Sequence, residues 1–244
     1  MAGKKGSKNK EVKKVYPPRV ENELLTDAEN AIDSWRIFKI MSEFVQGFEM
    51  IRKYDKAATF FGSARCGLED DIYKEACELS RRLAKRDFTI ITGGGNGIME
   101  AANRGAFQAG GKSIGLNIDL PHPQGINGSV NESIQFHYFF TRKVMLTFAS
   151  EVYVYFPGGF GTLDEFFELT TLVQTGKINR VPIILFGKEF WSPLIEWFEK
   201  SLVEKHQTVN RSDLEIFKLV DSVDEAFDTI IRLTDAYCES IGGC

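Results

Sequence analysis

Short apolar runs alternate with amphipathic segments along most of the chain after residue 57. The apolar runs are of strand length, and the segments between them space their apolar residues as a helix does. Strands are expected at 57–61, 88–92, 112–118, 134–140, 152–156 and 181–186, and helices at 70–85, 98–108, 141–149, 163–175, 190–205 and 223–236. Near-continuous apolar strands alternating with helices predict an α/β fold with a doubly wound, mostly parallel, Rossmann-like sheet.

Two segments precede this alternation. Residues 1–20 are basic and poor in apolar residues, which predicts a disordered tail, and residues 21–244 are expected to form a single domain. Residues 26–53 have the pattern of a helix with a broad apolar face that includes Trp35, Phe38 and Phe44. Because this helix lies outside the α/β repeat, we expect it to pack outside the sheet or against another subunit.

Composition narrows the function classes. A net charge of −4 argues against nucleic acid as the main partner. No apolar run reaches the length of a membrane span, and the basic N-terminus lacks the apolar segment of a signal peptide, so a cytoplasmic protein is expected. The four cysteines and three histidines show no metal-ligand spacing, which predicts reduced thiols and no metal site.

The first glycine cluster is Thr92-Gly93-Gly94-Gly95-Asn96-Gly97, between an expected strand and an expected helix. Glycine lets the backbone approach a ligand, and the N-terminus of the following helix suits a phosphate. A tight turn without a ligand is the alternative. Position 98 is isoleucine, so the dinucleotide fingerprint is not met, and GxxxxGK[ST] is absent. An NAD-dependent dehydrogenase and a P-loop NTPase are therefore disfavoured.

The second cluster, residues 157–165, reads PGGFGTLDE and has the same strand-to-helix context. Thr162 and Glu165 stand three apart, which is the spacing of a capping box, so Glu165 could simply cap the helix. The motif also places glycine backbone, a hydroxyl and two carboxylates at one strand end, and we favour a functional role. Both roles can hold together.

Arg142 and Lys143 follow Thr141, the expected cap of the helix at 141–149. Cations in the first turn of a helix oppose its macrodipole, typically at a cost of about 0.3–1 kcal/mol each. Side chains that curl into solvent are one explanation. A nearby anion, either a substrate phosphate or Glu165, explains two adjacent cations better.

Together these motifs resemble the LOG ("lonely guy") family of cytokinin riboside 5′-monophosphate phosphoribohydrolases, many of which are mislabelled lysine decarboxylases. The family pattern PGGxGTxxE matches residues 157–165, and its upstream Arg-Lys pair matches Arg142 and Lys143. GGGxxGxM matches residues 93–99 with the second glycine one place early, and FGS matches residues 61–63. The longer N-terminal helix is similar to that of the larger, second subgroup. The resemblance spans roughly residues 57–205.

The resemblance implies hydrolysis of a nucleoside 5′-monophosphate to a free base and ribose 5-phosphate, without a cofactor, by a homodimer or higher homo-oligomer. Arg142 and Glu165 would form the catalytic pair. Substrate binding is expected from Gly62, Ser63, Gly94, Gly95, Asn96, Gly97, Gln124, Lys143, Gly158, Gly159, Phe160, Gly161, Thr162, Asp164, Glu168 and Thr171.

Some positions depart from the family pattern. Shorter members carry Met-His where this chain has Phe140-Thr141, and a glutamate where it has Gln124. The preferred base, whether adenine, a cytokinin or another purine, therefore stays open. A true lysine decarboxylase would need a lysine in a pyridoxal phosphate motif, which is absent. A non-catalytic protein that binds a nucleotide or the molybdenum cofactor on the same fold is the remaining alternative.

Overall fold

The computed structural model describes residues 33–120 and 125–240. The expected tail, the start of the expected helix at 26–53 and Gln124 lie outside these residues. From Ile40 onward the chain forms one compact unit, while residues 33–39 belong to a separate one. The first helix, α2, runs from Asp33 to Ile51.

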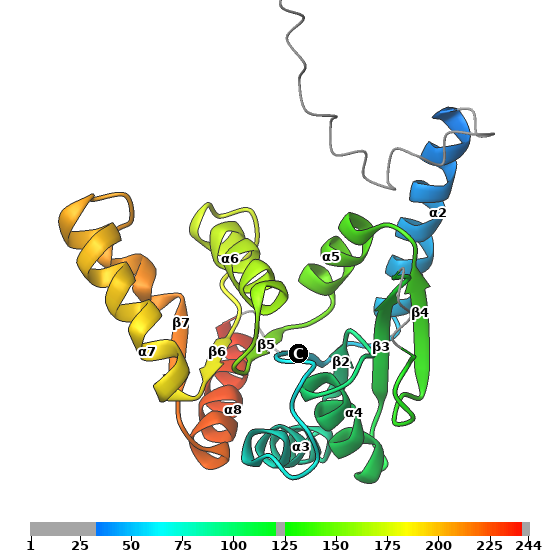
Figure 1. Ribbon diagram of the computed structural model, residues 1–244, viewed down its shortest axis with the longest axis horizontal. Coiled ribbons are helices and arrows are strands. Elements are labelled where there is room, and N and C mark those ends of the chain that lie inside the picture. The colour runs from blue at the N-terminus through cyan, green and yellow to red at the C-terminus, as the bar shows by residue number, and fades with distance from the viewer. Residues whose placement is uncertain (1–32, 121–124, 241–244) are drawn as a thin grey trace, which may run out of the picture. The chain divides into compact units, whose positions relative to one another are not determined.

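Seven parallel strands form one sheet in the order β4-β3-β2-β1-β5-β6-β7 (Figure 1). From β1 the chain adds strands β2 to β4 on one side and strands β5 to β7 on the other. The doubly wound parallel sheet predicted from the sequence is therefore confirmed. The strands are β1 Ala57–Phe61, β2 Thr89–Thr92, β3 Ser113–Ile118, β4 Glu132–Phe136, β5 Val152–Tyr155, β6 Ile183–Phe186 and β7 Phe217–Val220.

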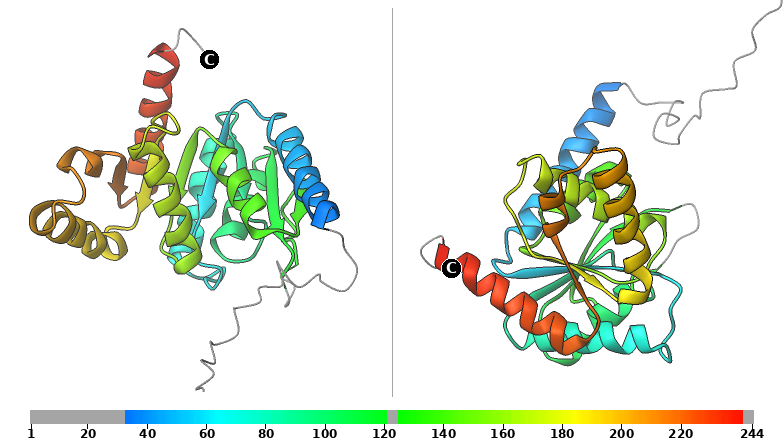
Figure 2. Two further views of the ribbon diagram at one scale, coloured as in Figure 1. Left: turned by 90° about the horizontal axis from the view of Figure 1, so that it is seen from above. Right: turned by 90° about the vertical axis from the view of Figure 1, so that its left-hand side faces the viewer.

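Helices cover both faces of the sheet (Figure 2). Side chains alternate along β1, so Ala58 and Phe60 join one buried cluster and Ala57 and Phe61 the other. The first face carries α3 Asp71–Ala84, α4 Ile98–Gln108 and α8 Val223–Ser240. The second carries α5 Phe139–Phe148, α6 Phe160–Gln174, α7 Lys188–Trp197, its π-helical continuation Phe198–Lys205, and the end of α2.

Several expected boundaries were wrong. Helix α5 begins at Phe139 and α6 at Phe160, so neither Thr141 nor Thr162 is the N-cap residue. The glycines at 159 and 161 suggested a loop, but glycine is tolerated at a helix start. The fourth strand ends at Phe136 rather than at 140. The 3₁₀ turn Arg211–Glu215 and strand β7 were not predicted, and in β7 the exposed Lys218 interrupts the apolar run that marks β5 and β6.

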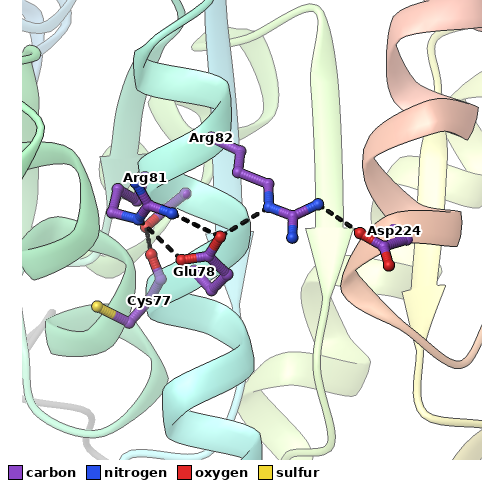
Figure 3. Close-up of polar contacts among 6 residues, drawn as sticks. Cys77, Glu78, Arg81, Arg82 and Asp224 are labelled. Carbon is purple, nitrogen blue, oxygen red and sulfur yellow. Dashed lines mark hydrogen bonds and ion pairs between the residues drawn. The ribbon is translucent and has the colours of Figure 1, made fainter.

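A charge cluster joins α3 to α8 (Figure 3). The carboxylate of Glu78 accepts hydrogen bonds from Arg81 and Arg82, and Arg82 also pairs with Asp224 at an Nη1–Oδ1 distance of 2.5 Å. These hydrogen bonds, chiefly that from Arg81, lower the pKa of Glu78 to about 2 despite its partial burial. The cluster therefore ties two helices of the same face together while the carboxylate is ionised.

Replacing Glu78 with Gln should lower the stability of the protein at neutral pH and have progressively less effect as the pH falls. A carboxyl whose folded pKa is depressed contributes stability above its unfolded pKa, and that contribution disappears as pH falls from about 4.5 toward 2. Because the group is one-third exposed, we expect only about 1 kcal/mol at pH 7. Urea unfolding at pH 7 and pH 2.5 measures this. A difference from wild type that persists undiminished at pH 2.5 would contradict it.

Candidate active site

A cavity of about 580 Å³ opens at the carboxyl ends of the central strands. Parallel α/β sheets bind ligands at this edge, where the strand order reverses. Segments that follow β1, β2 and β5 meet here with the first turns of α5 and α6. The lining residues are Phe61, Gly62, Ser63, Ala64, Arg65, Gly93, Met99, Phe139, Arg142, Leu146, Gly159, Phe160, Gly161, Thr162 and Glu165.

The start of α6 forms one wall of the cavity. Gly159 is the N-cap residue, and a Cβ placed on Gly159 or Gly161 would meet no atom within 4 Å. The first amides of a helix lack intrahelical partners and carry the positive end of its dipole, so this wall suits an anion. Gly158 has a different role, because a Cβ there would collide with the Thr162 side chain.

The capping box that the spacing of Thr162 and Glu165 would allow does not form. Thr162 lies inside the first turn, and its backbone amide donates to the carbonyl of Gly159 at 3.0 Å. The N-cap residue is Gly159, which has no side chain to cap the helix. Glu165 is consequently one turn into the helix, with its carboxylate toward the cavity.

Glu165 is a buried carboxyl group, with 6% of its surface exposed. Burial raises its pKa to about 7, with the nearby charge of Lys143 acting in the opposite direction, Glu168 adding to the rise and Arg142 opposing it. The protonated and ionised forms are therefore both populated near neutral pH. A titratable group tuned to neutrality inside a cavity is typical of a catalytic site.

Arg142 reaches the same cavity from α5. Its Nε donates to the carbonyl oxygen of Leu116 in β3 at 2.7 Å, which fixes the position of the guanidinium. Burial lowers the pKa of Arg142, and the charge of Glu165 partly offsets this. The tip of the side chain lies so close to Gly93 that a Cβ there would collide with Nη2. Arg142 and Glu165 thus line one cavity without a direct ion pair between them in the described contacts.

Lys143 points into a neighbouring groove of about 460 Å³. Its Nζ lies 2.6 Å from Asp164 Oδ2 and 2.8 Å from Glu168 Oε2. Burial acts to lower the pKa of Lys143, but its contacts with these two carboxylates and the charges of Glu165 and Glu168 together outweigh burial, and the net shift is upward. Lys143, Asp164, Glu168 and Thr171, all expected to bind substrate, therefore line this groove rather than the cavity. The negative charge that balances Lys143 therefore comes from two carboxylates of α6, Asp164 and Glu168.

Gly94 and Gly97, after β2, are required by the local backbone, since both have positive φ and lie close to backbone atoms of other segments. Gly93 lines the cavity, but Gly94, Gly95, Asn96 and Gly97 do not. The amide of Gly94 donates to Thr92 Oγ1 at 2.9 Å, and a Cβ on Gly97, whose φ is +69°, would collide with the backbone of residues 63 and 64. Their expected contact with phosphate stays a prediction.

Several lining residues were not among those expected at the site, including Arg65, Met99 and Phe139. Arg65 lies two residues after the strand-end FGS sequence, and that position could have identified it. Phe139 was assigned to a strand, which hid its place in the first turn of α5. Arg65 adds an exposed cation to the cavity wall, opposite in charge to a phosphate.

The fold and this cavity define a parallel α/β protein with an anion-suited helix start beside a buried carboxyl and a guanidinium. The model of the family described as "possible lysine decarboxylase" matches residues 99–230, more than half of the chain, so the chain belongs to this family. The predicted relationship to LOG proteins is confirmed by curated relatives of that name.

Two of these relatives are named cytokinin riboside 5′-monophosphate phosphoribohydrolases. The one from Rhodococcoides fascians is 26% identical over 159 residues, covering 63% of this chain and 79% of the relative. The one from Arabidopsis thaliana is 29% identical, covering 64% and 74%. Among solved structures, a molybdenum cofactor carrier protein from Chlamydomonas reinhardtii aligns with a TM-score of 0.56 at 22% identity, covering 74% of this chain and 98% of that one. This structural likeness shows a shared fold.

None of the helices in the described ranges combines the length and apolar character that crossing a bilayer requires.

Proposed function

We propose that the protein hydrolyses the N-glycosidic bond of a nucleoside 5′-monophosphate, AMP or cytokinin riboside 5′-monophosphate, to free base and ribose 5-phosphate. The observation that carries this proposal is the buried Glu165 carboxyl, with a pKa near 7, one turn from an anion-suited helix start. The phosphoribohydrolase names of the relatives support it.

In the proposed mechanism the 5′-phosphate binds the backbone from Gly159 to Thr162, with the dipole of α6 favouring its charge. The ribose then lies over Glu165. As the bond from C1′ to the base nitrogen breaks, its electrons leave with the base and C1′ acquires oxocarbenium character. The ionised Glu165 stabilises that positive charge. Water adds its oxygen to C1′, and the proton that it loses balances the one taken up by the base. Arg142 holds the phosphate or orients Glu165.

The direct test is to incubate the purified protein with AMP and to quantify adenine and ribose 5-phosphate in parallel. We expect the two products in equal amounts, with turnover that follows the protein concentration. A second incubation with cytokinin riboside 5′-monophosphate compares the two bases. Stoichiometric binding of AMP without release of base would overturn the proposal and favour the alternative, a non-catalytic binding protein.

We also propose a homo-oligomer, at least a dimer. Met41, Val45 and Phe48 recur at helical spacing on α2, and 55%, 56% and 39% of their respective surfaces are exposed. A run of large exposed apolar side chains marks an association surface, and a second copy would cover it through a two-fold contact. Light scattering should therefore give at least twice 27.6 kDa, and Val45→Lys should lower that mass. A 27.6 kDa monomer at micromolar concentration contradicts the proposal.

A further inference from the structure

We propose that Glu43, on α2, is a positioning residue that holds the first turn of α5, and with it Arg142, in the geometry needed for turnover. This inference rests on the proposed function. Glu43 precedes the region that the family model matches, which begins at residue 99. This role would make helix α2 necessary for the geometry of the active site.

The contacts of Glu43 converge on the start of α5. Oε1 accepts a hydrogen bond from the backbone amide of His137 at 2.7 Å. Oε2 accepts one from the amide of Tyr138 at 3.3 Å and another from the hydroxyl of Thr141. A single carboxylate from a different helix therefore binds three donors within five residues of chain, directly before Arg142.

These bonds do what the local sequence of α5 does not. Its N-cap residue is Tyr138, which provides no side-chain cap. Glu43 instead binds the amides of the N-cap residue and of the residue before it, and a negative charge at a helix N-terminus is favourable. Glu43 also supplies an anion close to the first turn of α5, which contains Arg142. The unfavourable interaction of Arg142 with the helix dipole is thereby reduced.

The helix that carries Glu43 is itself fixed against α5. A Cβ on Gly47 would collide with Met145 of α5, so the glycine permits α2 to approach this closely. One turn further on, Met50 is buried in the core. Glu43 therefore acts from a packed helix, and its carboxylate cannot follow α5 freely if α5 shifts.

Arg142 has little room for such a shift. Its Nε is bonded to the carbonyl of Leu116 and its tip lies against Gly93. A displacement of α5 by about 1 Å would break this arrangement, and errors of that size in a catalytic group cost up to about 10²-fold in rate. The carboxylate of Glu43 thus controls the placement of a group that it does not touch.

The test compares Glu43→Gln with a matched control, Glu132→Gln. Glu132 is also a carboxylate that binds residues near α2. It accepts hydrogen bonds from Lys53 Nζ at 2.5 Å and Tyr54 Oη at 2.6 Å, but it lies on β4, away from Arg142. We expect Glu43→Gln to lower kcat for AMP about tenfold with little change in KM. Glu132→Gln should keep kcat within about twofold while costing similar thermal stability.

A double mutant separates positioning from general destabilisation. In an Arg142→Lys background, Glu43→Gln should lower kcat no further, because the group that it positions is already lost, while the two stability costs should add. The proposal would be overturned if Glu43→Gln and Glu132→Gln lost kcat equally and the loss simply followed the fall in thermal midpoint. A full tenfold effect in the Arg142→Lys background would overturn it as well.

Amide hydrogen exchange measures, without substrate, whether the start of α5 is held by Glu43. Exchange at His137 and Tyr138 should accelerate in Glu43→Gln and stay unchanged in Glu132→Gln. A wild-type protein inactive on AMP, together with accelerated exchange in Glu43→Gln, overturns the proposed function alone. An active wild type with unchanged kcat in Glu43→Gln overturns the role of Glu43 alone.

Discussion

Glu165→Gln is expected to lower both kcat and kcat/KM for AMP by at least about 10²-fold, the usual loss when one electrostatic stabiliser of a transition state is removed. Gln has nearly the same shape but lacks the negative charge proposed to stabilise the oxocarbenium-like ribose. Because that charge acts mainly in the transition state, ground-state binding should be spared. Adenine release and AMP affinity, measured on the same preparation, test both halves of this expectation.

The control for this mutant is Glu189→Gln, an exposed carboxylate in the first turn of α7 outside the cavity lining, which should turn over AMP at the wild-type rate. Near-normal turnover in Glu165→Gln would remove Glu165 from the catalytic role. Lost AMP binding would instead assign it to substrate recognition.

The raised pKa of Glu165 adds a pH dependence. If the ionised form is active, kcat/KM in the wild type rises with pH and levels off above about 7. Stability changes in the opposite sense, since ionising a carboxyl whose folded pKa exceeds the unfolded value near 4.5 costs free energy as pH rises from about 4 to 7. Glu165→Gln should therefore be more stable than wild type at pH 8, by up to about 2 kcal/mol, and equal to it at pH 4.

Much of the fold could be predicted because its signals are local. Helix α4 was predicted with the observed bounds, Ile98–Gln108, since its apolar positions have a clear period between two glycine-marked turns. Strand ends of a parallel sheet meet at one edge, so the motifs after β1 and β5 were expected together, and Gly62, Ser63, Arg142 and Glu165 do line one cavity.

The rest depends on contacts between distant segments. Lys143 follows Arg142 in sequence, but consecutive helical residues point about 100° apart, and only the placement of α6 decides that Lys143 meets Asp164. Likewise, the hydrogen bonds from the start of α5 to Glu43 join residues nearly a hundred positions apart. A capping signal read within α5 alone selected Thr141, whose hydroxyl donates to Glu43 instead.

Gly93→Ala is expected to reduce AMP turnover to nearly the level of Arg142→Ala, about 10²-fold below wild type, with little loss of thermal stability. The new Cβ would collide with Arg142 Nη2 and lie 2.8 Å from Met99 Sδ. Both atoms are at the ends of flexible side chains, which can move away from the new Cβ without a shift of the backbone. The yielding group is the guanidinium, which would leave its hydrogen bond to Leu116.

Gly128→Ala is the matched control, because a Cβ there meets no atom within 4 Å and its turnover and thermal midpoint should match the wild type. The double mutant Gly93→Ala/Arg142→Ala supplies the sharper comparison. If the alanine acts by displacing Arg142, it has nothing left to displace in that background, and turnover should equal that of Arg142→Ala alone. A further drop would mean that Gly93 contacts substrate directly. Wild-type turnover in Gly93→Ala would show that the position of the guanidinium does not limit the reaction.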